Sequence, residues 1–271
     1  MTFPEPVSAS AIQSAKPVSP LRLHFIDVGY GDAILIEIPE GERILIDGGE
    51  AAAFPQLRAA LQQRNIHTID KVIITHFHSD HVGALPSILE NFVPLSSNGS
   101  KNIFMPFKPE SSALTAPLKQ HAVRIVRRGE TLMHTDTLQI SVLHPHTLSG
   151  NQNEDSLVLK ITHGNLRFLL AADADPNAQK KLYARYGDAL KCDLLKIPHH
   201  ANDSRVFAPF LASANPQIAI LTIGENHYQA PNEAVLALYQ AQSETLFRTD
   251  RDGDITVSCD GHKLNITCEW V

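Results

Sequence analysis

The sequence has 271 residues, of which 43% are hydrophobic and 19% are charged, a composition that can bury one sizeable core. The formal net charge of −6 argues against a protein that holds long nucleic acids on a broad cationic surface. No apolar run approaches the length of a membrane-spanning helix, so we expect no membrane insertion.

The first twenty residues are small, polar and rich in proline, and they lack the charged start and apolar centre of a signal peptide. We therefore expect a flexible leader at 1–20, followed by a single domain at 21–271. Three cysteines (Cys192, Cys259 and Cys268) are too few for a disulfide framework and mildly favour the cytoplasm. An exported form stays open if a leader has been removed, and the oligomeric state is not indicated.

Strand and helix patterns alternate along the rest of the chain. Runs separated by glycine-containing turns predict three opening strands, at 21–28, 32–38 and 43–49. The later elements are expected, in chain order, as a helix at 55–65, a strand at 71–75, a helix at 82–92, strands at 138–144, 156–162 and 166–173, a helix at 176–187, strands at 192–198 and 217–223, a helix at 232–242, and strands at 254–258 and 262–270. This order predicts one α/β domain with two sheets and outer helices.

The stretch "THFHSDH", residues 75–81, concentrates metal-binding side chains directly after an apolar run. Residues two apart in an extended segment point the same way, so His76 and His78 share one side. The next helix begins near Asp80 and His81, and the turn there lets this pair face a second, nearby point. Imidazole and carboxylate donors suit zinc, manganese or iron. The motif therefore predicts two adjacent divalent metal ions, with zinc favoured.

Three further apolar strands end on residues of the same kind. Asp47 ends "ILID", Asp173 ends "LLAAD", and His199 and His200 end "LLKIPHH". Taken singly, Asp47 and Asp173 have ordinary explanations as turn or helix caps. Four strands that all finish on metal-capable residues predict instead one catalytic edge with a bridging carboxylate.

Together these motifs resemble the metallo-β-lactamase superfamily, whose fold is an αββα sandwich of two mixed sheets with helices on the outer faces. The similarity is greater to the soluble hydrolase domain of its ComEC branch. It is carried by "FIDVGYGDAILIEIPEGERILIDGG", "NEDSLVLKITHGNLRFLLAADAD", "LLKIPHHANDS" and "LFRTDRDGDITV". The resemblance covers about residues 21–258, and it implies a dinuclear metal-dependent hydrolase.

The resemblance assigns six metal ligands between two ions. They are His76 and His78 on the first ion, Asp80, His81 and His200 on the second, and Asp173 on both. It also implies that Asp47 orients a ligand histidine, that Asp32 lines the site, and that His199 contacts a substrate oxyanion or protonates the leaving group.

The chain departs from the family pattern where a third histidine normally joins the first ion. The stretch "SGNQNEDSLVL" offers asparagines there, which leaves Asn153 or water to complete a weaker site, with His144 and His146 less favoured. Ala230 replaces a branch histidine, so either His227 substitutes for it or the substrate differs. The change of "HHGS" to "HHANDS" also puts the branch's substrate in question.

The implied reaction is attack by a metal-bridged hydroxide that Asp80 and Asp173 hold, with His199 or His227 stabilising the developing charge. We expect a phosphodiesterase that acts on a small molecule or another phosphodiester, whereas extended nucleic acid is not favoured by the charge. Two alternatives stay open: a carboxyl-ester, lactone or β-lactam hydrolase, and a non-catalytic metal-containing binding or sensory protein.

Overall fold

A computed structural model describes residues 20–95, 102–110 and 112–270. Residues 1–19 of the expected leader lie outside these ranges. Within them, no helix is long and apolar enough to cross a bilayer.

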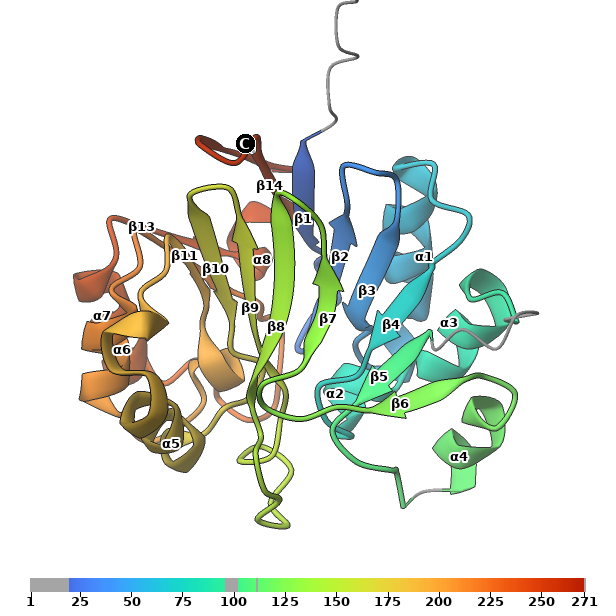
Figure 1. Ribbon diagram of the computed structural model, residues 1–271, viewed down its shortest axis with the longest axis horizontal. Helices are drawn as coiled ribbons and strands as arrows, with labels where there is room; N and C mark the ends of the chain where they lie inside the picture. Colours follow the sequence, from blue (N-terminus) through green and yellow to red (C-terminus); the bar gives the residue numbers. More distant parts are fainter. Residues whose placement is uncertain (1–19, 96–101, 111, 271) are drawn as a thin grey trace, which may run out of the picture.

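Two β-sheets lie face to face at the centre of the molecule (Figure 1). The first sheet has, in spatial order, β15 (Leu264–Cys268), β14 (Ile255–Cys259), β1 (Leu21–Phe25), β2 (Ala33–Glu37), β3 (Arg43–Asp47), β4 (Lys71–Ile73), β5 (Ile103–Met105) and β6 (Val123–Ile125). The second has β13 (Thr245–Arg248), β12 (Ile218–Leu221), β11 (Leu194–Lys196), β10 (Leu166–Leu170), β9 (Val158–His163), β8 (Leu138–His144) and β7 (Thr131–His134). Both sheets mix parallel and antiparallel neighbours.

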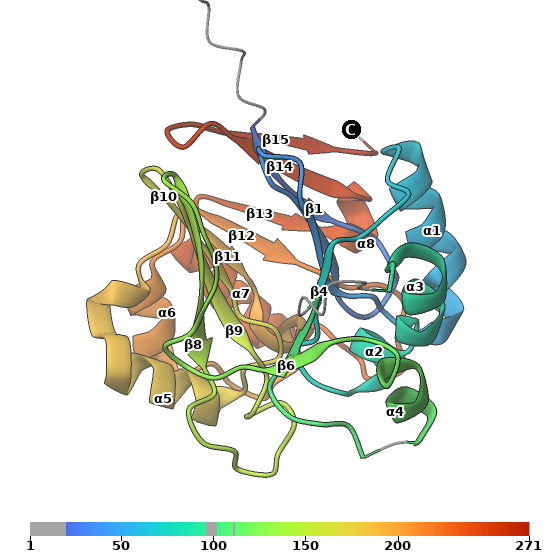
Figure 2. The same ribbon diagram turned by 45° about the vertical axis from the view of Figure 1, so that its right-hand side comes forward.

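Helices cover the two outer faces, as Figures 1 and 2 show. On the first sheet lie α1 (Phe54–Gln63), α2 (Ser79–Val82), α3 (Leu85–Phe92) and α4 (Ser112–Leu118). On the second lie α5 (Pro176–Tyr186), α6 (Ala208–Ala214) and α7 (Glu233–Gln242), and the one-turn α8 (Thr249–Asp252) follows β13. Short 3₁₀ turns occur at Ala51–Ala53, Gly187–Leu190 and Pro198–Ala201. The expected αββα sandwich is confirmed.

Three apolar layers hold the sandwich together. Phe25 and Phe168 are fully buried in the layer between the two sheets. Leu57 of α1 lies in the layer beneath the first sheet's helices, and Phe210 of α6 lies in the layer beneath the second sheet's helices. Burial of each such side chain contributes roughly 1.5–3 kcal/mol, so the sheets and helices form a stable frame for the loops at their edge.

Parallel pairing brings the functional strand ends to one edge. β3 pairs in parallel with β4, and β10 pairs in parallel with β11. Parallel strands end on the same side of their sheet, so the ends of β3 and β4 lie together, as do those of β10 and β11. The two sets of strand ends meet at one edge of the sandwich, where the side chains of the loops converge. In Figure 1 this edge faces downward.

Some elements differ from the sequence expectation. The helix expected at 82–92 begins three residues later, as α3, and Val82 is instead the last residue of α2. Between the two helices the chain packs closely at Gly83, where a Cβ would lie 2.4 Å from the backbone nitrogen of Ala51. β4 ends at Ile73, so the histidine motif lies in the loop after the strand. The short strands β5, β6, β7 and β13 were not expected, and neither were the short helices α4, α6 and α8, since segments of three to seven residues carry too little periodicity to be recognised.

Candidate metal centre

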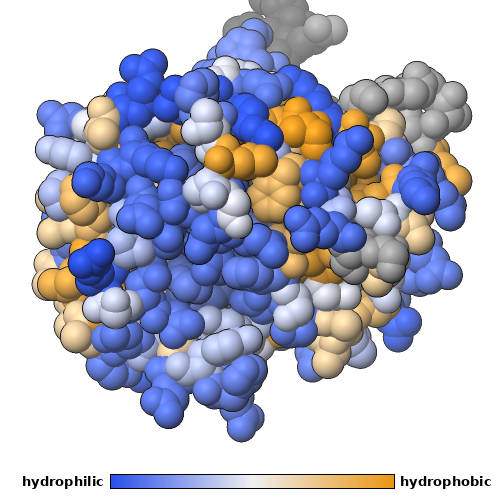
Figure 3. Space-filling model, turned by 90° about the horizontal axis from the view of Figure 1, so that it is seen from below, coloured by the Kyte–Doolittle hydropathy of each residue, from blue (hydrophilic) through white to orange (hydrophobic). Residues whose placement is uncertain are grey.

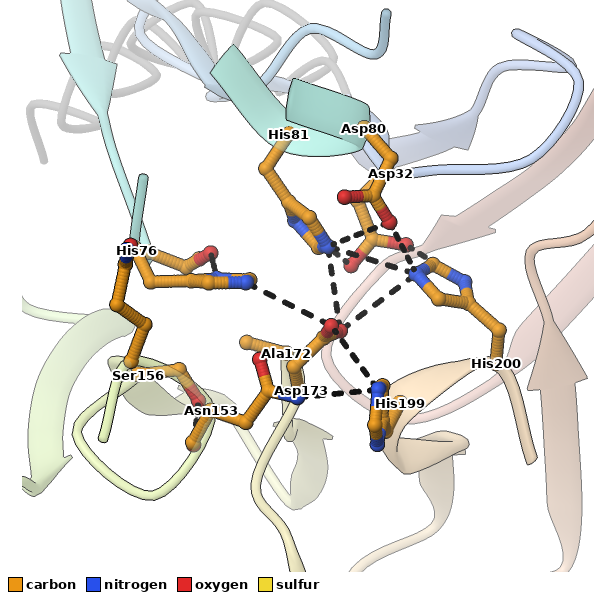
Figure 4. Close-up of polar contacts among 12 residues, drawn as sticks. Asp32, His76, Asp80, His81, Asn153, Ser156, Ala172, Asp173, His199 and His200 are labelled. Carbon is orange, nitrogen blue, oxygen red and sulfur yellow. Dashed lines mark hydrogen bonds and ion pairs between the residues drawn. The ribbon is translucent and has the colours of Figure 1, made fainter. Parts of the chain in front are cut away.

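The loops after β4, β10 and β11 bring the six expected ligands together. Figure 4 shows five of them, His76, Asp80, His81, Asp173 and His200. The ligand atoms of Asp80, His81, Asp173 and His200 all lie within 4.8 Å of one another. Those of His76, His78 and Asp173 form a second such group. Asp173 is shared by the two groups, which is the arrangement that the sequence predicted for a bridging carboxylate.

The four-residue group is compact and buried. His81 Nε2 lies 3.2 Å from Asp173 Oδ1 and 3.5 Å from Asp80 Oδ2. His200 Nε2 lies 3.4 Å from Asp80 Oδ2 and 3.5 Å from Asp173 Oδ1. Two imidazole nitrogens and two carboxylates that converge in this way form a donor set suited to a divalent transition metal.

The three-residue group has an unsatisfied donor. His76 Nε2 lies 3.6 Å from Asp173 Oδ2, is buried, and has no hydrogen-bond partner among the described residues. His78 is half-buried, and its ring centroid lies 4.7 Å from that of His76. A buried polar atom without a partner costs free energy, and a metal ion held by these side chains would remove that cost. The residues present therefore fit the metal ions that the motif predicts.

Asp47 fixes the orientation of the ligand histidines. Its Oδ2 lies 2.8 Å from His81 Nδ1, and its Oδ1 accepts the backbone N–H of Thr75. The Thr75 hydroxyl donates to Asp47 Oδ2 and lies 3.1 Å from His76 Nδ1. Since these contacts occupy the Nδ1 atoms, the Nε2 atoms of His76 and His81 are left to face the centre. His200 is held in the same way, with Nδ1 2.8 Å from the carbonyl oxygen of Thr222.

Lys196 was missed by the sequence analysis. It is fully buried, with Nζ 2.6 Å from Asp32 Oδ2 and 4.0 Å from Asp173 Oδ1. Thr222 donates its hydroxyl to the other oxygen of Asp32 at 2.5 Å. Asp32 therefore lies behind the ligands, where it holds a buried cation. A lysine within the apolar run "LLKI" was the available signal.

His199 lies beside the ligands and is open to solvent on one side. Its Nε2 is 3.9 Å from Asp173 Oδ2, and 19% of its side chain is exposed. Its Nδ1 lies 3.0 Å from Asp203 Oδ1, and its Nε2 lies 3.0 Å from Asn153 Nδ2. Asp203 was also missed, and it orients this imidazole from the altered "HHANDS" segment.

His227 lies apart from the ligand atoms, on an exposed loop. Its ring is 4.0 Å from that of Tyr228, which is 4.9 Å from that of Tyr30, and Tyr30 is 4.5 Å from His200. A row of aromatic rings thus links His227 to the centre. His144, an alternative ligand, instead contacts the backbone carbonyl of Glu154 at 2.6 Å.

The backbone at the centre is held in an unusual conformation. Asp47, Ala172, His199 and His200 all have positive φ angles, between 44° and 55°. Residues other than glycine adopt this region at a cost of order 1 kcal/mol or more each, and such strain gathers at functional sites. Each of these residues lies at the end of a strand or shortly after it, where the chain turns at the shared edge.

Burial and nearby charges shift the pKa values of the ligand side chains toward the protonation states that bind metal cations. Burial raises the pKa of Asp80, but the hydrogen bond with His200 and the charge of His81 lower it to about 2. Burial, aided by the charge of His81, holds the pKa of His76 well below its ordinary value. The carboxylate is therefore charged and the His76 imidazole neutral at pH 7, the states in which both bind metals.

The family model described as the metallo-beta-lactamase superfamily matches residues 26–224. The chain belongs to this superfamily, whose members include metal-dependent hydrolases. The match contains all six expected ligand positions. This superfamily uses divalent metals, and the His and Asp clusters of the structure have donor atoms that could hold them.

Two proteins illustrate the relationships in sequence. ComE operon protein 3 of Bacillus subtilis is 28% identical over 253 residues, which are 86% of this chain and 32% of that protein. The chain thus spans about a third of the length of the curated relatives that it matches along most of its length. A shorter match, 34% identical over 76 residues, covers 26% of this chain and 25% of ribonuclease Z of Metallosphaera sedula.

A solved structure extends the likeness of fold. CmlA, a diiron beta-hydroxylase from Streptomyces venezuelae, has a TM-score of 0.54 at 14% identity, over 91% of this chain and 55% of that one. Because this fold also carries a hydroxylase, the fold alone does not select the reaction.

Proposed function

We propose that the protein is a phosphodiesterase that works with two divalent metal ions, zinc being the favoured metal. The observation that carries the proposal is the position of Asp173 in both ligand groups, 3.6 Å from His76 and 3.2 Å from His81. A carboxylate shared between two adjacent sites is the arrangement used for two-metal hydrolysis of phosphate esters.

When bound, the ions would activate a water molecule and withdraw charge from the phosphoryl oxygens. The chain's own contribution is to hold the ligands rigidly. Asp47 and Thr222 orient His81 and His200, while Lys196 and Asp32 support the centre from behind. The nuclease named among the matched proteins, ribonuclease Z, also favours a phosphodiester over a carboxyl ester.

His199 is the side chain best placed to contact the substrate. It combines proximity to Asp173 with access from solvent. Burial lowers its pKa, but the hydrogen bond with Asp203 and the charge of Asp173 raise it above the ordinary value. The raised pKa favours the protonated imidazole, which could bind a phosphoryl oxygen or supply the leaving group with a proton.

The surroundings offer room for the groups on either side of the phosphate. A cavity of about 500 Å³ reaches the histidine motif at Phe77 and is also lined by Phe107 and Leu148, among others. A second, of about 290 Å³, adjoins Tyr30, His227 and Tyr228 on the side of His200. Aromatic walls favour substituents with flat or apolar groups, and His227 would act there on the substrate.

A panel of substrates tests the proposal. The protein, loaded with zinc, manganese or iron(II), is assayed on bis-p-nitrophenyl phosphate, p-nitrophenyl phosphorylcholine, a p-nitrophenyl carboxyl ester, a lactone and nitrocefin. We expect the highest kcat/KM on a phosphodiester. A higher value on the ester, lactone or nitrocefin would replace the proposal with the other hydrolase class. No turnover with both ions bound would indicate a binding or sensory protein.

A further inference from the structure

The first ion's group contains three ligands, two from the histidine motif and Asp173, whereas the second contains four. His76, His78 and Asp173 make up the smaller group, and no fourth His, Cys, Asp or Glu of the described residues joins it. His144, the last residue of β8, is committed to the carbonyl oxygen of Glu154. A fourth side-chain ligand from the described residues would therefore be of another kind, such as an amide oxygen.

Asn153 supplies such a donor. Its Oδ1 is buried and has no hydrogen-bond partner among the residues that the structure describes. Its Nδ2 lies 3.0 Å from His199 Nε2, and His199 Nε2 lies 3.9 Å from Asp173 Oδ2. Figure 4 draws His76 and Asn153 to one side of Asp173, with Asp80, His81 and His200 to the other. The asparagine thus lies on the side of the bridging carboxylate where the ligand is needed.

The loop holds Asn153 in place from both sides. The Ser156 hydroxyl donates to the backbone carbonyl of Asn153 at 2.9 Å. Gln152, its neighbour, accepts the backbone N–H of Phe77, which stands between His76 and His78 in the motif. Asp155 accepts the backbone N–H groups of Ser149 and Gly150 at 2.8–2.9 Å. These contacts tie the loop to the histidine motif, so the free Oδ1 is not the end of a freely moving side chain.

We propose that Asn153 Oδ1 is the fourth protein ligand of the first metal ion, in place of the histidine that the superfamily pattern provides. The inference rests on the proposed two-ion centre. With Oδ1 on the ion, the other end of the amide donates from Nδ2 to His199 Nε2, as the 3.0 Å contact requires. His199 then carries its proton on Nδ1, toward Asp203.

An amide oxygen changes the character of the first site. It is a neutral, harder and weaker donor than an imidazole, and carbonyl oxygens suit manganese and other hard ions better than they suit zinc. The first ion should therefore be held less tightly than the second, which has two imidazoles and two carboxylates. The first site should also exchange bound zinc for manganese more readily than the second site does.

Cobalt(II) tests the assignment without any substrate. The metal-free protein and three variants, Asn153→Ala, Asn153→Asp and Asn153→His, are titrated with Co²⁺ and followed by calorimetry and by visible absorption, which reports the number and kind of donors. Asn165→Ala, the same chemical change in the exposed turn between β9 and β10, is the control. The affinity of the second site serves in each variant as the measure of an intact fold.

We expect Asn153→Ala to weaken the first site about tenfold or more while the second site and the control keep wild-type affinity. Asn153→Asp should keep or strengthen the first site, since it retains an oxygen donor and adds charge. Asn153→His should strengthen it and change the cobalt spectrum toward a site with more nitrogen.

Unchanged first-site affinity and an unchanged spectrum in Asn153→Ala would overturn the inference. If Asn153→Ala does not fold, wild-type affinities and spectra in both Asn153→Asp and Asn153→His would overturn it equally. A protein that binds cobalt as expected but hydrolyses no phosphodiester would refute the proposed function and leave this inference standing.

Discussion

Lys196 and Asp32 form a buried ion pair between the two sheets, with Nζ 2.6 Å from Oδ2, directly behind the shared carboxylate of Asp173. Lys196 belongs to β11 of the second sheet, and Asp32 immediately precedes β2 of the first. Burial raises the pKa of Asp32, but the charge of Lys196 lowers it below the ordinary value. The pair therefore joins the halves of the sandwich where the metal ligands meet.

Replacing Lys196 by methionine should destabilise the protein by about 3–5 kcal/mol, because Asp32 is left charged and buried without its partner. Chemical unfolding of the metal-free protein measures this loss. Lys71→Met is the matched control: its ion pair with Glu42 is partly exposed, and it should cost about 1 kcal/mol or less. Adding Asp32→Asn to Lys196→Met should recover part of the loss. A Lys196→Met loss as small as that of the control would show that the pair does not support the centre.

His199 and His200 are neighbours with different expected roles. His200→Ala should release metal, since Nε2 lies 3.4 Å from Asp80 and 3.5 Å from Asp173 within the second group. His199→Ala should retain both ions and lower kcat by about 10²–10³-fold, as expected for a group that stabilises charge in the transition state. Metal content by mass spectrometry and kcat on the best diester separate the two. The reverse pattern would exchange the roles.

Gly31 permits the close approach of the first hairpin to the metal motif. A Cβ at Gly31 would lie 2.1 Å from the carbonyl oxygen of Asp80, and its φ is +138°. Gly41, at φ +98°, has open space around it. Gly41→Ala should therefore cost only the backbone strain, about 1–2 kcal/mol, whereas Gly31→Ala adds a clash of about 1–3 kcal/mol. Thermal unfolding and the metal affinity of the second site are measured for both variants. Equal losses of stability in the two variants would contradict the close approach.

The sequence predicted which side chains would lie close together, because these side chains follow strand ends. Asp47, Asp173 and the His199–His200 pair each end an apolar run, and parallel pairing brings such ends to one edge. A short-range pattern was therefore enough to predict which side chains would meet, and the two ligand groups contain every ligand that was expected.

The residues that support the ligands could not be predicted from the sequence in the same way. Lys196 has a role only because Asp32, 164 positions away in the chain, lies opposite it. Asp203 matters through its contact with His199, and Thr222 through its contacts with His200 and Asp32. Such roles depend on how the two sheets pack against each other, and this packing leaves no local periodic pattern in the sequence.

Long single-stranded DNA should be a poorer substrate than a small diester. Several arginines are held by carboxylates instead of forming an open cationic groove: Arg124 by Glu130 and Arg248 by Asp250, for example. The face that carries the site is mostly hydrophilic, with hydrophobic side chains gathered on its right half in Figure 3.

Each phosphate that a protein neutralises on a single strand adds about −0.7 to the slope of log affinity against log salt. The protein should therefore cut single-stranded DNA slowly and without sequence preference, with a shallow salt dependence of KM between 50 and 200 mM salt (about the range over which such slopes are measured). Rapid cleavage with a steep slope would show that a cationic path exists.

The central claim is that hydrolysis of a phosphodiester requires the ions that share Asp173. The most direct measurement titrates zinc or manganese into the metal-free protein while bound metal and the rate on bis-p-nitrophenyl phosphate are recorded in the same samples. We expect negligible rate with the second site alone filled and full rate as the first site fills, with Asp173→Ala inert at every metal concentration. Turnover in the metal-free protein, full turnover in Asp173→Ala, or a fully loaded wild-type protein that leaves the diester intact would contradict the account.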